Sequence, residues 1–170
     1  MIIPILIAGF VAYYLSGRNS PSEIASNKSN FELDYIYSDN GNRKAIKPAA
    51  DAFNDMVDYL AKEFGIKIYA TSGYRSQAEQ QTIWANALKK YGNEKEARKY
   101  AAKPGGSQHE RGLAIDVGGW SGKLSNSSEN GYTIRQTTEF AYLSQVMGAF
   151  GFRFYDKSIE PWHIEYIGKA

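Results

Sequence analysis

The apolar positions of this chain predict helices and strands that alternate along one folded unit. Between Pro48 and Phe64 the apolar residues recur at helical spacing, and Gly65 follows where a helix would end. The stretch from Ile66 to Thr71 alternates like a strand. The same two periods predict further helices over residues 77–91, 94–101 and 137–150, and further strands over residues 113–117, 152–155 and 163–166. This order is typical of an α+β domain with a small, mainly antiparallel sheet and flanking helices.

The chain begins with an apolar run from Ile2 to Leu15. As a helix this run would extend about 21 Å, less than the hydrocarbon core of a bilayer at about 30 Å. It lacks a basic n-region and a clear A-x-A site, which favours an uncleaved membrane anchor over a cleaved secretory signal. A helix docked on the domain or on a partner protein is a third interpretation. We therefore expect an anchor at residues 1–17, a polar tether at 18–30 and one domain at 31–170.

Composition removes several classes of function. The chain has 170 residues, of which 43% are hydrophobic, enough for one good core. Its net charge of +2 is too small to indicate a nucleic-acid partner. The absence of cysteine excludes a cysteine nucleophile, a cysteine-ligated zinc finger and a disulfide framework. The sequence also lacks the G-x-S-x-G, Walker and G-x-G-x-x-G motifs of serine hydrolases, P-loop NTPases and dinucleotide enzymes.

The two histidines of the chain stand in motifs that suit a catalytic metal. His109 lies in SQHERGLAID and His163 in EPWHIEY. A catalytic zinc usually takes three protein ligands and leaves a position for water, and His109, Asp116 and His163 supply such a set. Glu160, three residues before His163, can then act as the general base. Two imidazoles and a carboxylate suit one Zn²⁺ best, and would also accept cobalt or manganese.

Each of these side chains could also have a purely structural role that involves no metal. Either histidine alone could be a core imidazole held by hydrogen bonds. Only the combination with a carboxylate ligand and a base favours the metal. Glu110 and Glu165 also stand beside ligands, but we expect alternation along extended segments to point them away from the metal, and we assign them no catalytic role.

Three ordered motifs carry a resemblance to a known family: TSGYRSQAEQQ, AAKPGGSQHERGLAIDV and EPWHIEYIG. Together they resemble the VanY-type D-alanyl-D-alanine carboxypeptidases, which belong to the LAS group of zinc metallopeptidases. The resemblance covers roughly residues 48–168. It implies the LAS-type zinc peptidase fold, one zinc ion and the peptidoglycan stem peptide as substrate. The chain departs from the family at Glu165, since relatives often carry a basic residue after the last histidine.

The resemblance also assigns roles to residues outside the metal set. Arg75 matches the arginine that stabilises the developing oxyanion or holds the substrate, a role whose loss typically costs about 100- to 1,000-fold in turnover. Gln80 and Ser107 match substrate-contacting positions. Trp162 is expected to pack against an imidazole or the peptide and Tyr74 to wall the cleft, although both could equally be core aromatics.

The implied activity is that of a hydrolase of the bacterial cell wall. The resemblance favours a D,D-carboxypeptidase, with an L-alanyl-D-glutamate endopeptidase like the phage endolysins as the alternative. A zinc-bearing module that binds the wall without cutting it is a second alternative, against which the presence of both Glu160 and Arg75 argues. With the predicted anchor, the domain is expected to face the cell wall from a bacterial envelope or a virion membrane.

Overall fold

The computed structural model describes residues 32–168, and its longest helix is α3 (Lys47–Phe64). Proline stands in the first turn of this helix, where a missing N–H leaves no hydrogen bond unmade. Gly65 ends it in the left-handed conformation, with φ at 68°, and donates its N–H to the carbonyls of Ala61 and Leu60. The helix predicted from Pro48 to Phe64 is therefore confirmed, one residue longer at its start.

The strands form one antiparallel sheet and one separate hairpin. The sheet has the order β3-β4-β6-β5, and the hairpin pairs β1 with β2. Their bounds are β1 (Leu33–Tyr35), β2 (Lys44–Ile46), β3 (Tyr69–Ser72), β4 (Ala114–Gly118), β5 (Phe152–Phe154) and β6 (His163–Tyr166). The predicted α+β class with a small antiparallel sheet is confirmed. The β1–β2 hairpin was not predicted, and β3 begins three residues later than expected.

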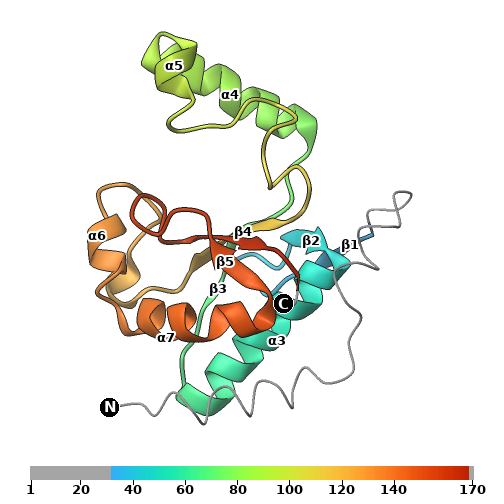
Figure 1. The fold of residues 1–170 in the computed structure, drawn as a ribbon, viewed down its shortest axis with the longest axis vertical. Coiled ribbons are helices and arrows are strands. Elements are labelled where there is room, and N and C mark those ends of the chain that lie inside the picture. The colour runs from blue at the N-terminus through green and yellow to red at the C-terminus, as the bar shows by residue number, and fades with distance from the viewer. Residues whose placement is uncertain (1–31, 169–170) are drawn as a thin grey trace.

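The core lies where α3 meets the sheet and the C-terminal helices (Figure 1). Phe53 of α3 is fully buried and meets the ring of Phe152 edge-on, with 6.3 Å between ring centroids. Burying such a side chain stabilises the fold by roughly 1.5–3 kcal/mol. The other helices on this body are α6 (Gly131–Ile134), α7 (Thr138–Val146) and two 3₁₀ turns (Ser121–Lys123 and Met147–Phe150). The helix predicted over residues 137–150 is thus an α-helix that tightens into a 3₁₀ turn.

A helical arm projects from this body (Figure 1). It contains α4 (Gln77–Tyr91) and α5 (Glu94–Ala97), whose main packing partners are each other. A capping box between Ser76 and Glu79 begins α4. Only Gln80 and Ala87 of α4 are buried, so this helix depends on its caps and on α5 more than on the core.

Several expectations concern residues outside the described range. The predicted anchor at 1–17 and tether at 18–30 both lie there. Within residues 32–168, no helix combines the length and the apolar character needed to cross a membrane.

Candidate metal centre and its cleft

The register of the sheet brings the three predicted metal ligands together. Asp116 of β4 stands directly opposite His163 of β6, and His109 lies in the loop before β4. Nδ1 of His163 is 3.0 Å from Oδ1 of Asp116, and Nε2 of His109 is 3.5 Å from Oδ2. One ligand atom from each residue fits within 4.8 Å of the other two. Residues 47 positions apart therefore form one compact donor group because their strands are neighbours.

The backbone fixes which nitrogen His109 presents. Its imidazole is buried, and Nδ1 lies 2.8 Å from the carbonyl oxygen of Gly73. A carbonyl only accepts hydrogen bonds, so Nδ1 carries a proton, and Nε2 is the nitrogen that faces Asp116. Gly73 has no room for a side chain, since an added Cβ would collide with the carbonyl oxygen of Lys44. This glycine thus lets the carbonyl reach the imidazole.

The donor group is electrostatically coupled. Burial alone raises the pKa of Asp116, but hydrogen bonds from His109 and His163 outweigh it and hold that pKa well below its usual value. Burial lowers the pKa of His163, whereas the hydrogen bond and charge of Asp116 raise it further, with a net rise. Asp116 is therefore an ionised carboxylate, the form that binds a cation.

Arg75 is held beside this group by three side chains. Its Nη1 donates to Oε1 of Gln80 at 3.0 Å, and its Nη2 donates to the hydroxyl of Ser72 at 3.4 Å. Nη2 is also 3.9 Å from Oδ2 of Asp116. Burial lowers the pKa of the guanidinium, which the charge of Asp116 partly offsets.

Gln80 is itself fully engaged. Its amide nitrogen donates to the carbonyl of Ala102 at 2.8 Å, and its side chain is 1% exposed. Both ends of the amide are thus used inside the protein.

Glu160 lies on the turn that leads into β6. Its N–H donates to the carbonyl of Asp156, and its own carbonyl accepts from the N–H of His163. Burial raises the pKa of its carboxyl, and the charge of His163 lowers it less than burial raises it. A carboxyl with a raised pKa is better suited to take and return a proton near neutral pH.

A cleft of about 1030 Å³ contains most of the predicted site residues. Residues of the body and of the arm line it together, and Ile83 and Tyr100 are among those from the arm. Ser107 and Trp162 line it, and the Ser107 hydroxyl accepts from the N–H of His109. Tyr74 is 40% exposed and is not among the lining residues. The substrate contacts assigned to these side chains stay predictions.

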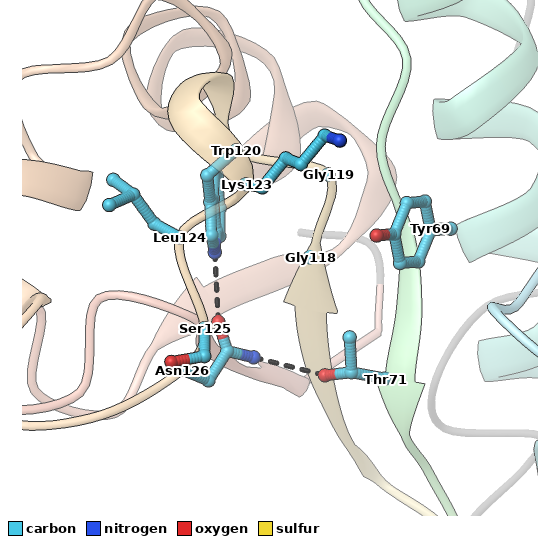
Figure 2. A pocket seen from close by; sticks show the side chains of 9 residues that line it. All are labelled: Tyr69, Thr71, Gly118, Gly119, Trp120, Lys123, Leu124, Ser125 and Asn126. Carbon is cyan, nitrogen blue, oxygen red and sulfur yellow. Dashed lines mark hydrogen bonds between the residues drawn. The ribbon is translucent and has the colours of Figure 1, made fainter.

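A second pocket of about 700 Å³ lies at the other end of β3 and β4 (Figure 2). None of the predicted site residues lines it. Asn126 accepts from the Trp120 indole at 2.8 Å and donates to Thr71 at 3.0 Å and to the carbonyl of Val117 at 2.8 Å. These bonds tie the loop after β4 back onto the sheet and account for the polar groups of Asn126, Trp120 and Thr71.

The donor chemistry of the first cleft fits a divalent metal. It combines two imidazole nitrogens with one ionised carboxylate, the set that suits zinc among the common biological cations. The hydrogen bond from Nδ1 of His109 to the Gly73 carbonyl already directs Nε2 toward the donor group. The residues present therefore fit the cofactor that the sequence implies.

Comparison of the sequence with known protein families identifies the family of this chain. The sequence profile of VanY, described as D-alanyl-D-alanine carboxypeptidase, matches residues 42–169. The chain belongs to the VanY family. The matched region includes all three donor residues together with Glu160 and Arg75.

Individual relatives of this VanY-family chain support the same placement. YodJ of Bacillus subtilis (strain 168) is 31% identical over 171 residues, which cover 92% of this chain and 58% of YodJ. The LdcB LD-carboxypeptidase structure superposes with a TM-score of 0.71 at 29% identity, covering 85% of this chain and 72% of LdcB. VanYB, solved with D-alanine-D-alanine, gives a TM-score of 0.62 at 26% identity, covering 84% and 80%. A VanY from a VanB-type resistance cassette was solved with Zn(II), at 26% identity, a TM-score of 0.59 and coverage of 82% and 81%.

Several charged residues that line the VanY-family cleft were not predicted as site residues, among them Glu165 and Arg153. Glu165 was expected to point away from the metal, and this is wrong, because residues two apart on a strand share a face. It lines the cleft, where it is paired with Arg153. The two-residue period of the strand predicted at residues 163–166 was the signal that could have found it. Glu110 is not among the lining residues, and its carboxylate accepts from the N–H groups of Gly105 and Ser107.

Proposed function

We propose that this chain is a zinc-dependent peptidoglycan carboxypeptidase that removes the terminal D-alanine from stem peptides ending in D-Ala-D-Ala. The observation that carries the proposal is one cleft that joins the metal-binding group to Glu160 and Arg75. Membership of the VanY family and the overlap with VanYB, solved with D-alanine-D-alanine, support this choice of substrate. The match spans only 58% of the length of YodJ, so the relatives' activity and substrate are proposed for this chain and not taken over from them.

The metal would be held by His109, Asp116 and His163. When bound, zinc acts as a Lewis acid toward the scissile carbonyl and makes water more acidic. Every remaining part of the reaction falls to side chains of this chain.

Glu160 is the proposed general base and then the general acid. Its carboxylate accepts the proton of the attacking water and afterwards returns it to the nitrogen of the leaving D-alanine. Arg75 donates hydrogen bonds toward the oxygen on which negative charge develops. Since Gln80 and Ser72 hold the guanidinium in place, it needs little rearrangement when that charge appears.

The test is mass spectrometry of pentapeptide muropeptides incubated with zinc-loaded protein. Glu160→Gln, which keeps the size of the side chain and removes the base, is run beside it. Glu139→Gln serves as a matched control, because Glu139 binds Ser121 and is absent from the cleft. Loss of one alanine with the wild type and the control alone supports the proposal. Release of a longer peptide would instead identify an endopeptidase, and no product in any sample would favour a wall-binding module.

A second candidate is an L,D-carboxypeptidase that removes the D-alanine of a tetrapeptide. The superposition with the LdcB LD-carboxypeptidase, at a TM-score of 0.71, favours it specifically. Tetrapeptide and pentapeptide muropeptides offered in equal amounts separate the two. Preferential loss of alanine from the tetrapeptide would replace the D,D-activity with the L,D-activity and leave the roles of Glu160 and Arg75 unchanged.

We also propose that the apolar run from Ile2 to Leu15 anchors the domain at a membrane facing the wall. The support is the sequence alone, since this run lies outside the described residues. Membrane fractionation of the full chain and of a chain lacking residues 1–17 tests it. Equal recovery of both in the soluble fraction would contradict the proposal.

A further inference from the structure

Glu165 is a buried carboxylate beside the metal group, and the proposed reaction gives it no role. It stands two positions after His163 on β6, on the same face of the strand, and is 4% exposed. Its neighbour across the sheet on β5 is Arg153. A buried charge of this kind is costly unless it is paired with an opposite charge or a hydrogen-bond donor.

Each oxygen of this carboxylate has its own neighbour. Oε2 accepts from Nη2 of Arg153 at 2.9 Å and from Nε at 3.3 Å, so the guanidinium neutralises and aims the carboxylate. Oε1 lies 3.9 Å from Nε2 of His163, an ion-pair distance that is too long for a hydrogen bond. The arrangement runs from an exposed arginine through a buried glutamate to a metal-binding imidazole.

The two imidazoles of the site present different nitrogens to the metal group. His109 faces Asp116 with Nε2, because its Nδ1 donates to the carbonyl of Gly73. His163 faces Asp116 with Nδ1 at 3.0 Å. A neutral imidazole that binds a metal through Nδ1 must carry its proton on Nε2. That N–H points into a part-buried setting, where it needs an acceptor, and Glu165 is the carboxylate beside it.

We propose that Glu165 is a positioning residue for His163. It favours the proton on Nε2 and thereby makes Nδ1 the metal-binding atom, while Arg153 holds the carboxylate in place. The inference deepens the proposed function and rests on its zinc site. Partners of this kind for metal-binding histidines typically change metal affinity by about 10- to 100-fold.

The direct test is the dissociation constant for zinc, measured by competition with a chromophoric chelator on the folded protein. We expect Glu165→Ala to weaken zinc binding by about 10- to 100-fold. Glu139→Ala is the matched control, since it removes a hydrogen-bonded carboxylate that does not line the cleft, and zinc affinity should stay at the wild-type value. Wild-type affinity in Glu165→Ala would overturn the inference.

A second measurement separates positioning from a merely structural role. In the zinc-loaded wild type, the Nε2 proton of His163 should give a downfield NMR signal that exchanges slowly with water, because a carboxylate accepts it. This signal should be lost or shifted in Glu165→Ala. An unchanged signal would contradict the proposed contact. If Glu165→Ala does not fold, Glu165→Leu keeps much of the volume and removes both the charge and the acceptor oxygens, and the same two readouts apply to it.

The outcomes also distinguish this inference from the function on which it rests. Wild-type protein that fails to bind zinc would remove the proposed function and, with it, this role of Glu165. Wild-type protein that binds zinc, with both Glu165 variants matching it in affinity and in the imidazole signal, would remove only the role of Glu165.

Discussion

Replacing Gln80 by leucine tests whether this residue works by holding Arg75. The substitution keeps a side chain of similar size at a position that is 1% exposed. It removes the 3.0 Å hydrogen bond to the charged guanidinium and the 2.8 Å hydrogen bond to the Ala102 carbonyl. The bond to the charged guanidinium contributes about 1.5–3 kcal/mol and the bond to the carbonyl about 0.5–1.5 kcal/mol. The free energy of unfolding should therefore fall by about 2–4.5 kcal/mol.

The expected effect on turnover follows from the proposed role of Arg75 in stabilising the developing oxyanion. An oxyanion-stabilising donor contributes about 100- to 1,000-fold, and a displacement of about 1 Å in a catalytic group can cost about 100-fold. Gln80→Leu leaves the guanidinium present but loosely held, so kcat should fall by about 10- to 100-fold with little change in KM. Steady-state release of alanine from a pentapeptide measures both constants.

The matched control is Gln81→Leu, one residue along α4 on the exposed side of the helix. It should leave kcat, KM and the unfolding midpoint near their wild-type values. A raised KM with unchanged kcat in Gln80→Leu would show that this residue contacts the substrate, as the family resemblance implies. No change in either constant would refute the reasoning about Arg75.

Three further predictions concern the metal group and the core. Gly73→Ala should weaken zinc binding and lower the unfolding midpoint, because the new Cβ collides with the Lys44 carbonyl and shifts the residue-73 carbonyl that orients His109. Chelator competition and thermal unfolding measure the two effects. Wild-type zinc affinity in this variant would contradict the prediction. Zinc at 100 times its dissociation constant should raise the free energy of unfolding by about 2.7 kcal/mol over protein in EDTA, and equal midpoints would contradict a zinc site. Phe53→Ala should destabilise the fold by about 3–5 kcal/mol in urea unfolding, since this ring is fully buried, and a loss below about 1 kcal/mol would contradict its place in the core.

The structure brings the three predicted ligands together, and the sequence could single them out because the signals are local. His163 and Glu160 share one short motif, and Asp116 stands in an apolar run that predicts a buried strand. The structure then adds the register that sets Asp116 opposite His163. That pairing depends on which strands are neighbours, and periodicity within a single strand carries no such information.

Other features could not be predicted because they depend on contacts between distant segments. The amide of Gln80 bonds to a carbonyl 22 positions away, and nothing in the helical pattern of α4 indicates that contact. The strands β1 and β2 have three residues each, too few to establish an alternating pattern. The two-residue period of β6 could have placed Glu165 on the same face as His163. Its pairing with Arg153 could not be predicted, because it depends on β5 and β6 being neighbours in the sheet.

The arm is a contiguous segment of the chain that begins and ends at neighbouring points of the body. Its chain leaves the body after Arg75 and returns near Ala102, and Gln80 joins these two points through its side chain. The three donor residues and Glu160 all lie outside the arm, whereas Ile83 and Tyr100 within it form one wall of the cleft. One contiguous segment could therefore be exchanged between relatives without altering the donor residues or Glu160, provided that the incoming segment keeps a glutamine at position 80 to hold Arg75.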